Sequence, residues 1–207
     1  MSVRLRNIKH KTVENRSSFP LRGTAAAVGH TAVMRVAALL RGINIGPNKR
    51  IAMADLRAIV ESLGHTDVET YLQSGNVVFT PKRRTKDLSA PLSAAILDAT
   101  GHDVPDVLRT GAELADVDDA NPYPVDDPTR AVVAFLADAV DLGDLALGDL
   151  SSYLPDELTI SGRELYVSVP NGQGRSKLME ALTKRTLPTT LTVRNWRTVE
   201  ALAEMTR

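Results

Sequence analysis

Arginine and side-chain amides stand where two apolar runs end in the first part of the chain. Arg41 and Asn44 follow an apolar run over residues 36–40, and Gln73 and Asn76 lie in a turn between two further runs. An arginine beside an amide can make a forked contact to a carboxylate or a phosphate. The competing explanation is an ion pair between the arginine and an acid of the same protein. These residues therefore indicate an anion-binding edge or an internal ion pair, and both remain open.

A second group of polar residues follows further along the chain. Arg175, Ser176 and Lys177 come directly after a glycine at the expected start of a helix. A glycine-flanked turn at a helix start presents free N–H groups and the positive end of the helix dipole to an anion. The strict spacing of a Walker loop is missing, so phosphate or carboxylate binding is predicted and nucleotide hydrolysis is not.

The last polar stretch combines Arg194, Asn195 and Trp196. Arg194 ends an apolar run as Arg41 does, and the same two explanations apply to it. Asn195 is a typical N-cap, whose side chain can satisfy a free N–H group of the first helical turn. Trp196 is expected in the core.

Catalytic groups are much less evident. Ser74 lacks the surroundings of a nucleophile elbow, and the four histidines show no metal-ligand spacing. Several aspartates between residues 116 and 127 lack the pattern of a calcium loop and indicate a solvated acidic segment. We therefore name no catalytic residue and predict neither a metal nor a cofactor.

The elements that position these residues occur in the same order twice. Strands are expected over residues 36–40, 68–72, 77–79 and 104–108, and helical periodicity covers residues 53–63 and 88–99. After a short acidic helix, strands are expected over residues 131–137, 158–160, 165–169 and 191–193. Helices are expected over residues 142–150, 175–184 and 196–203, the first of them interrupted by two glycines. The prediction is an α/β (α+β) fold of two tandem ferredoxin-like βαββαβ halves, residues 34–120 and 121–207, with a C-terminal helix.

This topology places the candidate residues at the edges of the sheets. The first two strands of a half run the same way, so Arg41, Asn44, Gln73 and Asn76 are expected at one edge. The last two strands of a half also end together, which predicts that residues 172–177 and 194–196 share an edge. We further predict that the edges of the two halves serve one cleft.

Composition limits the classes of function. The formal net charge of +0 disfavours a dedicated nucleic-acid binder, and no apolar run is long enough to span a membrane. Cysteine is absent, which fits a cytoplasmic protein and excludes thiol chemistry. Residues 1–33 are basic and lack periodicity, so they are expected to be a disordered extension ahead of a natural start at Met34.

Six ordered motifs together resemble a known family. They are Leu39-Leu-Arg-Gly-Ile-Asn-Ile-Gly46, Met53-Ala-Asp-Leu-Arg57, Tyr71-Leu-Gln-Ser-Gly-Asn-Val-Val-Phe79, Gly162-Arg-Glu-Leu-Tyr166, Gly174-Arg-Ser-Lys-Leu178 and Arg194-Asn-Trp196. The chain resembles, over about residues 34–207, the bacterial family catalogued as domain of unknown function 1697. The resemblance implies a cytoplasmic protein with ferredoxin-like halves and carries no activity. Pro47, Val193 and Arg197 depart from the usual family pattern, which affects the detail of their loops.

The sequence thus favours a protein that binds a small phosphate- or carboxylate-bearing ligand. The ligand-binding residues would be Arg41, Asn44, Gln73, Asn76, Arg175, Ser176, Lys177 and Arg194. Two alternatives stay open: an enzyme acting on a phosphorylated or acyl substrate through the same residues, and a non-catalytic protein-interaction domain. Nucleic-acid and membrane partners are disfavoured, and the sequence does not define the oligomeric state.

Overall fold

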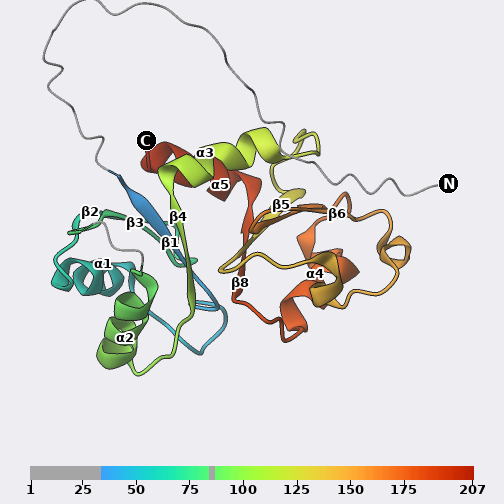
Figure 1. The fold of residues 1–207 in the computed structure, drawn as a ribbon. Coiled ribbons are helices and arrows are strands. Elements are labelled where there is room, and N and C mark those ends of the chain that lie inside the picture. The colour runs from blue at the N-terminus through green and yellow to red at the C-terminus, as the bar shows by residue number, and fades with distance from the viewer. Residues whose placement is uncertain (1–33, 84–86) are drawn as a thin grey trace, which may run out of the picture.

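A computed structural model describes residues 34–83 and 87–207 of the chain (Figure 1). The predicted disorder of residues 1–33 lies outside the described residues.

The first half forms a four-stranded sheet with two helices on one face and a third helix on the other. Its elements are β1 (Val36–Leu40), α1 (Met53–Ser62), β2 (Thr66–Tyr71), β3 (Asn76–Thr80), α2 (Ser89–Thr100), β4 (Asp106–Thr110) and α3 (Gly111–Ala120). The strand order is β2-β3-β1-β4, and each neighbouring pair is antiparallel. This is the arrangement of a ferredoxin-like half.

The second half repeats the sheet with a different first connection. Its strands are β5 (Ala131–Leu136), β6 (Glu157–Ser161), β7 (Glu164–Ser168) and β8 (Leu191–Asn195), in the order β6-β7-β5-β8. Its α-helices are α4 (Lys177–Lys184) and α5 (Trp196–Met205). The predicted α/β (α+β) class, with two similar halves and a C-terminal helix, is confirmed.

The prediction of a helix over residues 142–150 is wrong. Two short 3-10 helices, η1 (Leu142–Leu145) and η2 (Leu150–Tyr153), take its place. Ala146 and Gly148 adopt φ of 49° and 72°. Two left-handed residues this close end an α-helix, because the helix requires negative φ throughout.

Two predicted boundaries also shift for local reasons. The strand expected over 104–108 begins only at Asp106, because Pro105 has no N–H group to give to the ladder. The helix expected from residue 175 begins at Lys177, since Ser176 is its N-cap and accepts a hydrogen bond from the Met179 N–H. A short 3-10 helix, η3 (Gln173–Arg175), precedes it.

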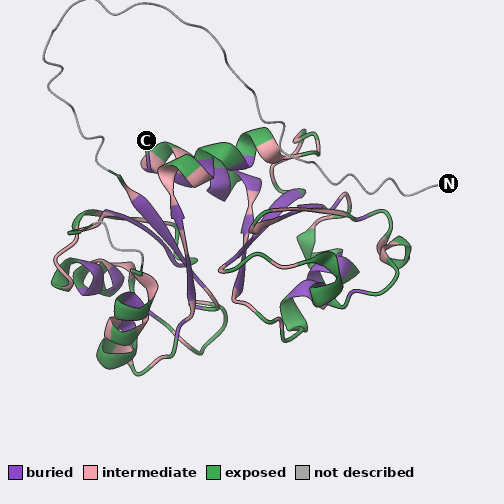
Figure 2. Ribbon diagram, viewed as in Figure 1, coloured by how far each residue is buried: buried purple, intermediate pink, exposed green. Residues whose placement is uncertain are grey.

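A shared core joins the halves. Ala37 and Leu39 of β1 face this core, whereas Ala38 and Leu40 face the outer helices. The shared core also contains Leu114 and Val117 of α3, Val133 and Phe135 of β5, Tyr166 of β7, and Trp196, Val199 and Leu202 of α5. Figure 1 shows α3 and α5 lying across the top of both sheets, with α1 and α2 outside the first sheet and α4 outside the second. In Figure 2 both sheets are largely buried.

Trp196 is 3% exposed, which confirms that it belongs to the core, and Asn195 caps α5 as predicted by accepting the Thr198 N–H. No helix within residues 34–83 and 87–207 is both long and apolar enough to span a membrane.

Candidate functional site

The loops after β1 and β2 meet at one edge of the first sheet, as the topology predicts. Asn44 holds them together: its Nδ2 donates to the carbonyls of Ile51 and Gln73 at 2.9 and 2.8 Å. Its Oδ1 accepts the Ile51 N–H at 3.0 Å. Asn44 itself adopts a left-handed φ of 56°, which asparagine tolerates better than most residues. The amide of Asn44 therefore organises the loops.

Arg194 links the two halves. Its backbone lies in β8, but its side chain runs back along the strand, where Nη1 donates to Thr192 Oγ1 at 2.8 Å. Its Nε donates to Asn76 Oδ1, and Nη2 donates to the Leu40 carbonyl at 2.9 Å. Burial lowers the pKa of Arg194 to about 10, and no carboxylate within residues 34–83 and 87–207 pairs with it. Arg194 and Asn76 thus bind each other across the interface between the halves.

Arg109 of β4 also links the two halves, with its side chain reaching from the first half to the second. No motif in the sequence singles it out. Its side chain is 0% exposed, and its Nε donates to Glu164 Oε1 at 2.7 Å. Nη2 donates to the carbonyls of Leu136 and Arg163 at 2.7 and 3.0 Å. The guanidinium also lies 5.5 Å from the centre of the Phe135 ring. Burial lowers the pKa of Arg109, and Glu164 opposes this shift.

The two arginines occupy the same place in each half. Each is the fourth residue of the last strand, and each reaches the carbonyl that ends the first strand of the other half. Each also binds the first residue of the other half's third strand, Glu164 for Arg109 and Asn76 for Arg194. We call this pair of contacts the reciprocal clasp. It is an isologous contact, the kind that a two-fold axis generates.

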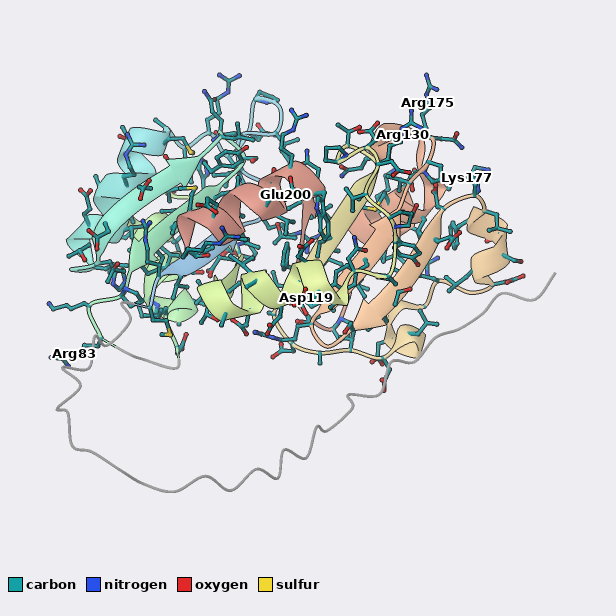
Figure 3. All side chains as sticks on the ribbon, turned by 90° about the horizontal axis from the view of Figure 1, so that it is seen from above. Arg83, Asp119, Arg130, Arg175, Lys177 and Glu200 are labelled. Atoms are coloured by element: carbon teal, nitrogen blue, oxygen red, sulfur yellow. The ribbon has the colours of Figure 1, made fainter. Side chains whose placement is uncertain are left out.

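The Arg175-Ser176-Lys177 group lies away from this edge. Ser176 is 7% exposed, and its hydroxyl is the N-cap acceptor of α4. Arg175 and Lys177 are exposed, and in Figure 3 they project outward at the upper right edge of the second half. Residues 172–177 do share an edge with the end of β8, but the Arg194 side chain leaves that edge for the first half.

Arg41 borders a cavity of about 480 Å³ between the halves. Its backbone N–H donates to the Pro105 carbonyl, but its guanidinium makes no hydrogen bond or ion pair with the described residues. All other lining residues come from the end of α4 and the segment leading to β8. They are Thr183, Lys184, Arg185, Thr186, Leu187, Pro188, Thr189 and Thr190. In Figure 1 the loop after β1 lies close to the start of β8 at the lower end of the sheets.

A second cavity, of about 620 Å³, adjoins the first along α4. It includes Arg175 and Ser176, and it shares Thr183 and Lys184 with the Arg41 cavity. Arg41 and Arg175 therefore line adjoining cavities at opposite ends of a helix about 12 Å long. The structure brings Arg41, Asn44, Gln73, Asn76 and the Arg194 side chain to one edge, and it leaves Arg175, Ser176 and Lys177 at the other.

Equivalent positions in the two halves can be identified from their backbone hydrogen bonds. At the position of Arg41 the second half has no arginine. The Arg41 N–H donates to the Pro105 carbonyl, and in the second half the Ala137 N–H donates to the Thr190 carbonyl at the same place. The fold therefore accepts alanine where Arg41 stands. Asp106 likewise stands where the second half has the buried Leu191.

Comparison with known proteins gives a family and a fold. Residues 33–166 match the family model described as "Protein of unknown function (DUF1697)". The chain is also similar to a solved structure described as that of conserved bacterial protein SP0830 from Streptococcus pneumoniae. The TM-score is 0.69 at 22% sequence identity, and the match covers 84% of this chain and 99% of that chain. Likeness at this identity shows the fold alone. No curated protein matches the chain.

Proposed function

The chain belongs to the DUF1697 family, a family of unknown function, and from the geometry of this member we propose that it binds a small anionic ligand in the Arg41 cavity. The observation that carries the proposal is the Arg41 guanidinium, unpaired among the described residues, at a cavity whose other wall holds Lys184, Arg185, Thr186 and Thr190. The other two threonines of the wall, Thr183 and Thr189, donate their hydroxyl protons to Met179 and Asp138. A phosphate or a carboxylate fits such a lining, because guanidinium and hydroxyl groups both donate hydrogen bonds to it.

The cationic groups at the cavity differ in how free they are. Lys184 Nζ donates to Glu180 Oε1 at 2.6 Å, and Arg185 donates to the Ala146 carbonyl. Arg41 alone among these three has no such contact with the described residues. A half-buried arginine without an anion favours a ligand that supplies one, since the charge is then both partly desolvated and uncompensated.

Binding is favoured over turnover by the kinds of group that line the cavity. The alternative of an enzyme acting on a phosphorylated or acyl substrate calls for a general acid or base within reach of the arginine. The lining supplies cations, hydroxyls and two apolar residues, which are groups that hold an anion in place. We include a cytoplasmic location in the same proposal, on the absence of cysteine.

The test is a titration of the full chain with inorganic phosphate and with simple carboxylates such as acetate and succinate, followed by calorimetry and thermal shift. Arg41→Ala is expected to weaken phosphate binding about 10- to 100-fold, because a hydrogen bond to a charged group contributes about 1.5–3 kcal/mol. Arg41→Lys keeps the charge and is expected to retain part of the affinity.

Arg197→Ala is the matched control, since Arg197 is an exposed arginine on α5. It is expected to bind phosphate as the unchanged protein does. Equal binding by the Arg41→Ala and Arg197→Ala variants, or no binding of any of these anions, would contradict the proposal.

A further inference from the structure

The turn beside Arg41 is longer than the fold requires. In the second half Ser161 and Glu164 are paired, so Gly162 and Arg163 alone join β6 to β7. The corresponding turn in the first half runs from Leu72 to Gly75, between the paired ends of β2 and β3. The two turns occupy the same place in their sheets, so strand pairing does not require the two extra residues. The carbonyls of the longer turn accept hydrogen bonds from Asn44 and Arg194, whereas the Leu72 side chain is left at the surface.

The longer turn also holds a leucine in an unfavourable state. Leu72 adopts a left-handed φ of 55°, and 58% of its surface is exposed. The left-handed region costs an ordinary L-residue about 1–2 kcal/mol, and an exposed leucine recovers none of this through burial. Strain of this kind persists where the surrounding structure imposes it, and it is found at binding sites.

A second apolar side chain is displayed on the adjoining loop. Ile45 is 74% exposed, and it follows Asn44, whose amide donates to the Gln73 carbonyl in the turn of Leu72. Ile43, on the other side of Asn44, is 1% exposed and anchors the loop in the core. Ile45 and Leu72 are therefore the exposed apolar tips of two loops fastened to each other.

The loop that carries Ile45 is basic in sequence, although its Lys49 donates a hydrogen bond to the backbone carbonyl of the acidic residue Asp103. The segment from Arg41 to Ala52 carries Arg41, Lys49 and Arg50 and no acidic residue. An apolar surface with this surrounding is complementary to a partner that is both anionic and apolar. Arg41 is the first-half residue that lines the proposed anion cavity, and it begins the loop that carries Ile45.

We infer that the ligand is an amphipathic anion, a phosphate or carboxylate that carries an alkyl or aryl group. Its charged end binds Arg41 in the cavity, and its apolar group lies against Ile45 and Leu72. The inference rests on the proposed function and adds the class of ligand to it. The inference gives one function to Arg41, Ile45 and Leu72, whose side chains the fold does not use for packing.

A chain-length series of monoalkyl phosphates tests the inference. Inorganic phosphate is compared with ethyl, butyl and hexyl phosphate by calorimetry on the full chain. Each methylene that becomes buried is expected to tighten binding by up to about fourfold. Leu72→Asn and Ile45→Ser are expected to remove this dependence on chain length while leaving the affinity for inorganic phosphate unchanged.

The variants are chosen so that folding and binding separate. Asparagine accepts a left-handed φ more readily than leucine, so Leu72→Asn is expected to fold with equal or higher stability. Leu97→Gln is the matched control, because Leu97 lies on α2 and is 48% exposed. It is expected to keep the full dependence on chain length.

Failure of the inference differs from failure of the proposed function. If all the alkyl phosphates bind like inorganic phosphate and Arg41→Ala weakens them all, the anion site stands and the apolar extension is refuted. If none of them binds, the proposed function itself fails. If Leu72→Asn instead abolishes self-association in sedimentation, or binding to vesicles of phosphatidylcholine and phosphatidylglycerol, the tips contact a second copy or a membrane and the inference is wrong.

Discussion

The reciprocal clasp makes a quantitative prediction, because its two arms have the same geometry and different charge. Replacing either arginine by methionine keeps most of the apolar stem and removes the guanidinium. Arg109→Met leaves the carboxylate of Glu164, whose side chain is 16% exposed, without its partner. Arg194→Met leaves the neutral amide of Asn76 and backbone carbonyls. We therefore expect Arg109→Met to be the more destabilising change.

The magnitudes follow from what each variant leaves behind. Removing one partner of a buried ion pair costs about 3–5 kcal/mol, and Arg109 also loses its contact with the Phe135 ring, about 0.5–1 kcal/mol. Arg194 is a buried charge without a carboxylate partner, so the lost hydrogen bonds are offset in part by the recovered hydration of the guanidinium. A net cost of about 1–2 kcal/mol is expected for Arg194→Met, against about 3.5–6 kcal/mol for Arg109→Met, and hence a difference between the variants of about 3 kcal/mol.

Urea unfolding at pH 7 measures the difference, with Trp196 as the probe. It is the single tryptophan of the chain and lies in the core shared by both halves, so its fluorescence reports on their docking. For a chain of this size the difference corresponds to about 6–12 °C in melting temperature. The double variant Arg109→Met/Glu164→Gln is expected to recover part of the loss. If Arg194→Met proves as destabilising as Arg109→Met, the reasoning from unpaired charge is refuted.

Two further predictions concern single residues of the first half. Burial raises the pKa of Asp106, and its Oδ2 has no hydrogen-bond partner among the residues that the structure describes. The folded state therefore binds a proton more tightly than the unfolded state, which lowers stability at neutral pH. Asp106→Asn is expected to raise the free energy of unfolding at pH 7 by on the order of 1 kcal/mol. This gain in stability should decline as the pH falls through the raised pKa of Asp106. Urea unfolding from pH 7 to pH 4 measures it, and a constant or growing gain would contradict the reasoning. Gly75→Ala is expected to destabilise by more than about 1 kcal/mol, because a Cβ at this φ of 79° would lie 2.9 Å from Ile43 and Leu40. Gly42→Ala is its control, with a φ of 73° but open space, and equal melting temperatures of the two variants would rule out the steric explanation.

The fold was largely predictable from the sequence, because the spacing of apolar residues and the positions of turn residues determine the helices and strands locally. A continuous apolar run placed β1, and the side chain of Asn195 identified the start of α5. The exceptions also have local causes. Ala146 and Gly148 are left-handed and divide the expected helix into 3-10 turns, and Pro105 delays β4.

The roles of the candidate arginines were not predictable, because they depend on partners far away in the chain. Arg194 binds Asn76, and nothing in the residues around either one indicates the other. Arg109 lies inside an ordinary amphipathic strand, and only its equivalence to Arg194, one residue before the helix N-cap in each half, could have drawn attention to it. For Arg41 the sequence left two explanations open, an anion-binding site and an internal ion pair, and it could not decide between them.

The isologous nature of the reciprocal clasp has a consequence for stoichiometry. In a dimer of two identical halves, every position would carry the same residue in both halves. Any ligand site away from the two-fold axis would therefore occur twice. Here the two halves are parts of one chain and are free to differ, and they do: arginine stands at position 41 and alanine at position 137. The architecture of a symmetric pair thus holds a single asymmetric site, and a titration of the full chain should saturate at one anion per molecule.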